Sequence, residues 1–259
     1  MNSALRPFSA SRFRLALATA LAAPLALAGC NGEEDVEGGV SGEPIDAIEA
    51  PAGRTWLETT AVSEDGLGYI VGNPDAPLKL IEYASHTCGA CANFSATGKA
   101  PLKEYISTGV VSFEQREVFL NTFDVVIASL TQCGPSERMQ ALSDEVWQNL
   151  PTVMQGIQGA QGMEAASQLP LDERFVQIGE VTGLVDFFAA RGLSADQART
   201  CLADADTIDA LVKGSSEIAE EVGVAGTPTF TLNGSKVDAI SWGQLEPILQ
   251  RAGARDSGE

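Results

Sequence analysis

Two stretches of the chain carry the hydrophobic pattern of β-strands. Residues Leu78–Ala84 form a mostly apolar run, which is typical of a buried strand. Residues Val110–Val118 are rich in β-branched side chains and alternate in polarity, as expected of the next strand. Cys88–Ile106 lies between them and predicts a helix that is interrupted or ends near Gly98 and Pro101.

From residue 124 to about 223, apolar residues recur mainly at three- and four-residue spacing, which predicts helices. The expected helices are Asp124–Gln132, Ser136–Asn149, Leu171–Arg191, Ser194–Ala203 and Asp206–Val222. The order of elements is therefore strand, helix, strand and then a long helical block.

The C-terminal part predicts a hairpin followed by a helix. Thr229–Leu232 and Ser235–Val237 flank Asn233-Gly234, a dipeptide favoured in two-residue hairpin turns. Trp242–Ala252 then has helical periodicity. Near the other end of the domain, Tyr69–Val71 predicts an edge strand.

The sequence Cys88-Gly89-Ala90-Cys91 falls at the junction of the first central strand and its helix. Two intervening residues allow the sulfurs to close a small ring, and a helix N-terminus offers free N–H groups and partial positive charge to a thiolate. Cys88 is therefore the expected nucleophile. Half of a zinc site and an inert disulfide are the alternatives for such a pair.

The first 29 residues predict a lipoprotein signal peptide. Arginines precede a short apolar stretch, Leu15–Ala28, that Pro24 interrupts. The following Leu27-Ala28-Gly29-Cys30 resembles the bacterial lipobox, in which Cys30 becomes lipid-modified. Cleavage after Ala26-Leu27-Ala28, which would give a soluble exported protein, is the alternative.

Composition separates a flexible tether and tail from a folded domain. Residues 30–65 include a stretch rich in Gly, Glu, Asp and Pro and are expected to form a flexible tether; residues 253–259 are expected to form a flexible tail. The formal charge of −19 argues against binding to nucleic acid or to anionic lipid headgroups. No dimerisation segment is evident, so a monomer is expected.

The chain has five cysteines, an odd number for an exported protein. If Cys30 carries lipid and Cys88 pairs with Cys91, then Cys133 and Cys201 remain as partners for a structural disulfide. An oxidising compartment permits both bridges. Two unrelated buried thiols are the alternative for Cys133 and Cys201.

A second signal lies at the entrance to the hairpin, in Val224-Ala-Gly-Thr-Pro-Thr-Phe230. Pro228 cannot donate to a sheet and marks an edge, a bulge or a cis turn. Together with the Cys-x-x-Cys pair, this sequence resembles the thioredoxin superfamily, and the helical block narrows the resemblance to DsbA-like thiol:disulfide oxidoreductases. The resemblance implies an α/β thioredoxin fold over residues 66–252, with a helical insertion at about 124–223.

The same resemblance implies a role for individual residues. Cys88 would be the exposed nucleophile, Cys91 its buried partner, and Pro228 the cis-proline that shapes a substrate groove. Glu82 falls where family members carry a buried acid that relays protons to Cys91; a surface glutamate on an edge strand is the alternative. The residues expected to line the substrate site are Gly89, Ala90, Gly226 and Thr227.

The chain departs from this pattern because Gly89-Ala90 lacks the histidine that many relatives carry beside the second cysteine. His86 is the chain's one histidine. It either tunes Cys88 electrostatically or is a loop residue without such a role.

The expected function is disulfide exchange with reduced or disulfide-bonded exported proteins, with oxidation as the expected direction and no cofactor. Such an enzyme needs a membrane redox partner to reset its cysteines, and the expected location is the periplasm, with lipidated Cys30 as the membrane anchor. The alternatives are a reductase or isomerase, a copper or zinc carrier using His86, Cys88 and Cys91, and a non-enzymatic binding module.

Overall fold

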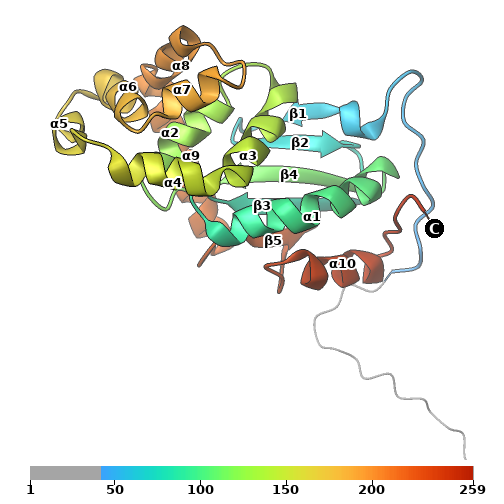
Figure 1. The fold of residues 1–259 in the computed structure, drawn as a ribbon. Coiled ribbons are helices and arrows are strands. Elements are labelled where there is room, and N and C mark those ends of the chain that lie inside the picture. The colour runs from blue at the N-terminus through green and yellow to red at the C-terminus, as the bar shows by residue number, and fades with distance from the viewer. Residues whose placement is uncertain (1–41, 259) are drawn as a thin grey trace, which may run out of the picture. The chain divides into compact units, whose positions relative to one another are not determined.

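A mixed β-sheet forms the centre of the structure, a computed structural model that describes residues 42–258 (Figure 1). The strands of this part of the chain lie in the order β1-β2-β4-β3-β5-β6. Their bounds are β1 Thr60–Val62, β2 Gly68–Gly72, β3 Leu78–Ala84, β4 Val111–Glu117, β5 Thr229–Leu232 and β6 Ser235–Val237. The two strands predicted from hydrophobic runs, β3 and β4, are thus the middle pair.

Strand pairing brings together segments that are far apart in sequence. Strands β3 and β4 are parallel, whereas β5 pairs antiparallel with β3 on its other side. In this register Glu82 lies between Gln115 of β4 and Phe230 of β5, and Tyr83 pairs with Thr229. The start of β5 therefore lies beside the end of β3, where the Cys-x-x-Cys segment follows.

Helices supply most of the remaining structure. The α-helices are α1 Gly89–Ser107, α2 Thr122–Thr131, α3 Met139–Gln148, α4 Leu150–Gly159, α5 Met163–Ser167, α6 Leu171–Val181, α7 Leu184–Ala189, α8 Ala195–Leu202, α9 Ala205–Val222 and α10 Trp242–Arg251, and the short 3₁₀ helices are η1 Trp56–Glu58 and η2 Ser136–Arg138. Helices α2 to α9 all lie between β4 and β5 in the chain, and we call them the helical insertion.

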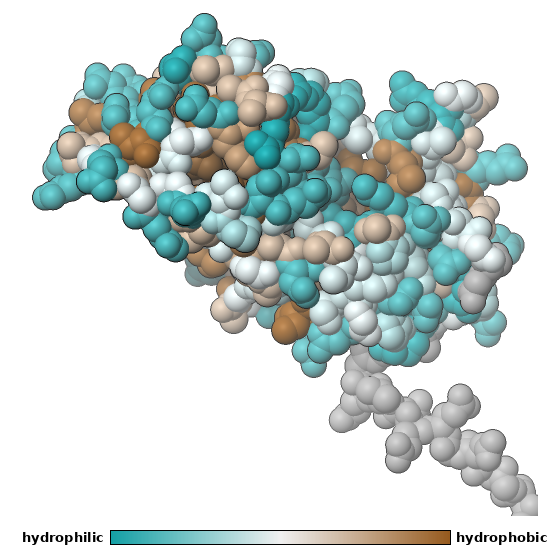
Figure 2. Space-filling model, viewed as in Figure 1, coloured by the Kyte–Doolittle hydropathy of each residue, from teal (hydrophilic) through white to brown (hydrophobic). Residues whose placement is uncertain are grey.

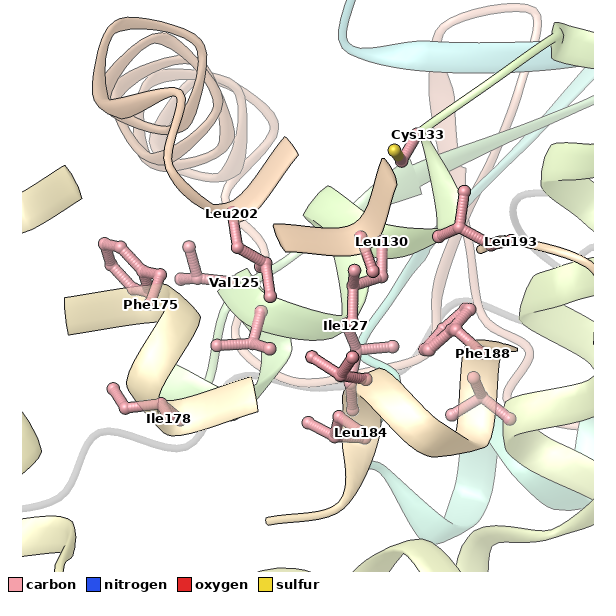
Figure 3. Packing of buried hydrophobic residues seen from close by; sticks show 14 of the residues in the cluster. Val125, Ile127, Leu130, Cys133, Phe175, Ile178, Leu184, Phe188, Leu193 and Leu202 are labelled. Carbon is pink, nitrogen blue, oxygen red and sulfur yellow. The ribbon is translucent and has the colours of Figure 1, made fainter. Parts of the chain in front are cut away.

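The sheet and the insertion each have a hydrophobic core. Leu80, Phe94, Phe230 and Leu245 belong to the buried cluster that joins the sheet to α1 and α10. A second cluster lies among the insertion helices, where Figure 3 shows residues such as Ile127 and Phe188 from different helices. Two separate cores explain how a long helical segment can interrupt the sheet without disturbing its register.

Polar side chains cover most of the face shown in Figure 2, and apolar side chains gather there mainly over the helical insertion. This surface agrees with the acidic composition of the chain. Among the helices of residues 42–258, none combines the length and apolar character needed to cross a bilayer.

Residues 42–65 differ from the flexible tether expected there. Strand β1 pairs with β2, so β2 is not the edge strand that the sequence predicted. Trp56 is buried and its Nε1–H donates to the carbonyl of Ile48 at 2.7 Å. One bulky aromatic residue can anchor such a segment, although the surrounding sequence is polar and irregular.

The expected tail also makes close contacts with the domain. Ala254 is fully buried, and the backbone carbonyl of Gly253 accepts a hydrogen bond from the N–H of Ile45 at 2.9 Å. The predicted signal peptide and Cys30 lie outside the described residues, as does the first part of the predicted tether.

Three predicted helices differ in extent from the observed ones, and α4 and α5 lie outside the predicted helices. The expected Ser136–Asn149 helix is divided into η2 and α3. Helix α1 continues through Gly98 and Pro101, and a Cβ at Gly98 would lie 2.6 Å from the ring of Phe94. The glycine is thus a packing requirement and not a helix end. The expected Leu171–Arg191 helix is divided into α6 and α7 by Gly183, which has a φ of +75°.

A disulfide joins Cys133 to Cys201, with a Cα–Cα distance of 6.0 Å. Cys133 follows the end of α2 and Cys201 lies in α8, so the bond connects two helices of the insertion. It is the pairing expected from the cysteine count, and it closes a loop of 68 residues.

We predict that replacing both Cys133 and Cys201 with alanine lowers the free energy of unfolding by about 4 kcal/mol, because a loop of this length restricts the unfolded chain strongly. Urea denaturation of the double variant and of the oxidised wild-type protein measures the difference. An unchanged unfolding midpoint and slope would contradict this role for the disulfide.

Candidate functional site

The sulfur of Cys88 lies at the N-terminus of helix α1. Its Sγ accepts a hydrogen bond from the backbone N–H of Cys91 at 3.3 Å, which makes Cys88 the N-cap of the helix. As a thiol, Cys88 can also donate to the carbonyl oxygen of Thr227 at 3.2 Å. Cys88 is partly exposed, whereas Cys91 is fully buried, and both are free thiols. The structure therefore places a reachable sulfur next to a protected one.

The bond between Thr227 and Pro228 is cis, and it directly precedes strand β5. The pairing of β5 with β3 holds this turn beside the Cys-x-x-Cys segment, 139 residues away in the chain. Thr229 Oγ1 donates to the carbonyl of Gly226 at 2.7 Å, which fixes the approach to the turn. The two sequence signals thus meet at one site.

The dipeptide between the cysteines is exposed. Gly89 and Ala90 form the first residues of α1, and a Cβ at Gly89 would meet no other atom within 4 Å. Gly226 is also exposed and its added Cβ would likewise meet open space. Of the residues expected to line a substrate site, Gly89, Ala90 and Gly226 are therefore open to solvent, and Thr227 contacts Cys88.

Hydrogen bonds at the helix N-terminus favour the thiolate of Cys88. Hydrogen bonds from the Cys91 side chain, the Thr227 side chain and the backbone N–H groups of Cys91 and Ala90 lower the pKa of Cys88 to about 5, although burial acts in the opposite direction. Cys91 shows the opposite behaviour. Its hydrogen bond to Cys88, its burial and the nearby Glu82 raise the pKa of Cys91 far above the ordinary value of a thiol. One sulfur is ionised at neutral pH and the other keeps its proton.

Glu82 is a buried acid on the central strand β3, and not a surface residue of an edge strand. It is fully buried, and neither carboxylate oxygen has a hydrogen-bond partner among residues 42–258. Burial raises the pKa of Glu82 to about 8, with Lys99 partly opposing this effect. Because the charge of Glu82 contributes to the raised pKa of Cys91, the two groups are electrostatically coupled.

His86 is fully buried and contacts the polar side chains of Glu117 and Ser143. Its Nδ1 lies 3.0 Å from Oε2 of Glu117, and its Nε2 is hydrogen-bonded to the hydroxyl of Ser143 at 2.9 Å. The imidazole also stacks on the indole of Trp147, with ring centroids 5.1 Å apart. Both ring nitrogens are engaged inside the protein, so the imidazole is not available to an external ion.

Within residues 42–258, no group of three His, Cys, Asp or Glu side chains is arranged to hold a metal ion. The combination of His86, Cys88 and Cys91 expected for a copper or zinc carrier therefore has no support from this geometry.

Sequence reasoning missed Lys99 and its partners. The Nζ of Lys99 donates to Oε1 of Gln115 at 3.0 Å and to Oδ1 of Asp144 at 2.8 Å. Gln115 is the β4 neighbour of Glu82, so the ammonium group lies over the same face of the sheet. The available signal was spacing: Lys99 follows Cys91 by eight residues and shares the buried face of α1.

Comparisons with known proteins find a family model and sequence relatives that match most of the chain. The family model described as Thioredoxin matches residues 64–251. A Rickettsia bellii protein named "Putative protein-disulfide oxidoreductase" is 21% identical over 206 residues, or 79% of this chain and 71% of its own. A Rickettsia typhi protein of the same description is 24% identical over 73% of this chain and 63% of its own.

Two solved structures are similar over most of the described residues. The protein-disulfide isomerase of Novosphingobium aromaticivorans superimposes with a TM-score of 0.66 and 25% identity, covering 71% of this chain and 97% of the other. The Wolbachia pipientis alpha-DsbA1 structure has a TM-score of 0.56 and 21% identity, and the match covers 71% of this chain and 89% of the other.

We predict that Cys88 of the reduced protein ionises with a midpoint near pH 5, as measured by thiolate absorbance and by the rate of alkylation at different pH values. Replacing Cys91 with alanine should raise this midpoint, because the strongest hydrogen bond to the Cys88 thiolate is lost. A wild-type midpoint near that of a free cysteine, about 8.5, would contradict the site geometry.

We also predict that Glu82→Gln slows attack of Cys91 on a mixed disulfide formed at Cys88 by about 100-fold, because the variant lacks a base for the Cys91 proton. In the wild-type protein this rate should rise with pH through about 8, where Glu82 ionises, and the variant should lack that rise. The Cys88 titration serves as the internal control and should be unchanged. Equal rates and equal pH profiles would exclude a proton-transfer role for Glu82.

Proposed function

The chain belongs to the thioredoxin family and is a DsbA-like protein-disulfide oxidoreductase, and on that premise we propose that it oxidises exported proteins through Cys88 and Cys91. The observation that carries this proposal is the Cys88 sulfur at the N-terminus of α1, beside the cis Thr227–Pro228 bond. The active enzyme would begin the cycle with a Cys88–Cys91 disulfide.

In the first step, a substrate thiolate attacks Sγ of Cys88 and forms a mixed disulfide. The Cys88–Cys91 bond breaks and its electron pair moves to the sulfur of Cys91. Protonated Glu82 then supplies a proton to Cys91, which agrees with an acid that keeps its proton up to a pH of about 8. A second substrate thiolate attacks the substrate sulfur, so the substrate leaves oxidised and Cys88 leaves as a thiolate.

Stabilisation of that final thiolate supports the oxidising direction. A pKa of about 5 in the folded protein, below the unfolded value of about 8.5, stabilises the reduced protein at pH values above both. This stabilisation is lost as the pH falls through about 5, and the disulfide form lacks it. The reduced enzyme is therefore favoured at neutral pH, which makes its disulfide a stronger oxidant.

Substrate binding would use backbone groups beside the cis-proline. An extended peptide can lie along Thr227 and Gly226 as an added strand, with Gly89 and Ala90 on the opposite side of Cys88. Backbone recognition tolerates many substrate sequences, which suits an enzyme that oxidises different exported proteins. Pro228 would shape this groove and has no N–H to compete for the peptide.

We place the enzyme in the periplasm, held to a membrane by lipid on Cys30 and acting as a monomer. A Cys133–Cys201 disulfide in the folded domain suits an oxidising compartment. A membrane redox partner would reoxidise Cys88 and Cys91 after each cycle. The acidic charge of −19 disfavours nucleic acid as a partner.

Disulfide isomerisation is the second candidate. The similar structure from Novosphingobium aromaticivorans is described as a protein-disulfide isomerase. An isomerase must remain reduced in part, since its thiolate opens wrong disulfides. The potential of the Cys88–Cys91 pair separates the candidates.

We predict a potential above about −180 mV when the protein is equilibrated with glutathione, because the stabilised thiolate favours the reduced form. The oxidised protein should also introduce disulfides into a reduced, unfolded substrate, and the Cys88→Ser variant should not. A value near that of thioredoxin, about −270 mV, would contradict the oxidising direction and indicate a reductase.

A further inference from the structure

Residues Ser85–Thr87, which join β3 to Cys88, contact both cysteines. The carbonyl of Ser85 accepts a hydrogen bond from the backbone N–H of Cys88 at 3.3 Å. The backbone of Ser85 also lowers the pKa of Cys91, against the larger effects that raise it. A shift of this short loop would therefore move the N-cap sulfur and change the surroundings of its partner together.

Asp124, in the first turn of α2, is fully buried against this loop. Its Oδ1 accepts hydrogen bonds from the hydroxyl of Ser85 and from the backbone N–H of Thr87, both at 2.9 Å. Its Oδ2 accepts from the hydroxyl of Thr87 at 3.2 Å and from the N–H of Leu120 at 2.9 Å. One carboxylate from the helical insertion thus satisfies four donors around the active-site loop.

Trp147 of α3 holds the loop from a second direction. Its Nε1–H donates to the carbonyl of Ser85 at 3.1 Å, while its ring stacks on His86. Asn121, the N-cap of α2, adds a hydrogen bond from its side-chain amide to Thr87 Oγ1 at 2.8 Å. Each of the three loop residues is therefore bound by a side chain of the insertion or of the turn that begins it.

We propose that Asp124 and Trp147 are positioning residues through which the helical insertion sets the reactivity of Cys88. The proposal rests on the proposed function of the Cys88–Cys91 pair. It assigns the insertion a role beyond covering the sheet: its first and second helices fix the loop that presents the nucleophilic sulfur to the N-terminus of α1.

The carboxylate of Asp124 is required because all four of its partners are donors. An asparagine in its place offers one acceptor oxygen, and its NH₂ group would face a donor at the other position. At least one buried donor then loses its partner, which favours displacement of the loop. The hydrogen bonds that stabilise the Cys88 thiolate depend on the position of that loop.

The expected sign separates positioning from simple electrostatics. Removing a nearby negative charge would by itself make the Cys88 thiolate more stable and lower the pKa of Cys88. Displacing the N-cap sulfur acts in the opposite direction, because hydrogen bonds to the thiolate are lost. A rise in the pKa of Cys88 in Asp124→Asn would therefore indicate that the sulfur has been displaced from its position at the start of α1.

The test measures the Cys88 midpoint and the glutathione equilibrium of the full chain carrying Asp124→Asn. We expect the midpoint to rise by about one pH unit and the equilibrium to shift about tenfold toward the disulfide, which is about 30 mV more negative. Leu193→Ala is the stability control, since Leu193 is an apolar residue of the insertion core. It should lower the melting temperature and leave both redox readouts unchanged.

Trp147→Phe provides an independent variant that keeps a ring against His86 and removes the donor to Ser85. It should raise the Cys88 midpoint in the same direction, and it decides the question if Asp124→Asn does not fold. If the Asp124→Asn protein folds and its Cys88 midpoint is unchanged or lower, the proposal is overturned. If Asp124→Asn does not fold, an unchanged Cys88 midpoint in Trp147→Phe overturns it. An ordinary thiol midpoint in the wild-type protein would instead refute the proposed function itself.

Discussion

The position of one sulfur atom at the start of α1 is the constraint on which the site depends. Cys88 caps the helix, receives the N–H of Cys91 and lies against the carbonyl of Thr227. A thiolate is stabilised there without any basic side chain in the Cys-x-x-Cys dipeptide. The Cys88 thiolate is stabilised chiefly by the Cys91 side chain, with further hydrogen bonds from the Thr227 side chain and the start of α1. Every element that holds these groups in place therefore contributes to the chemistry.

Three parts of the chain meet to fix the position of the Cys88 sulfur. Strand β3 ends at the loop Ser85–Thr87, and strand β5 brings Thr227 and Pro228 beside that loop. The helical insertion holds the same loop through hydrogen bonds to Asp124. The buried Glu82 and Lys99 share one face of the sheet, and the charge of Glu82 raises the pKa of Cys91. Acid, cation and thiols thus form one coupled group, partly separated from solvent, in which a proton can move without a large rearrangement.

The local features of this arrangement could be predicted from sequence. The two cysteines, Pro228 and the Asn233-Gly234 turn carry signals that depend on a few neighbouring residues. Asp124 and Lys99 could not be recognised in the same way, because their importance comes from partners 37 and 16 residues away. Strand β1 was missed for a related reason: a three-residue strand has too few positions to show alternation.

Trapping of mixed disulfides tests the central claim most directly. A Cys91→Ala variant cannot release a substrate bound to Cys88 by internal attack, so it should accumulate covalent complexes with a protein that offers a reactive disulfide. Mass spectrometry should locate the bond at Cys88, and the rate of complex formation should follow the fraction of Cys88 thiolate. Complexes formed through Cys133 or Cys201, or none at all in a folded variant, would contradict the account.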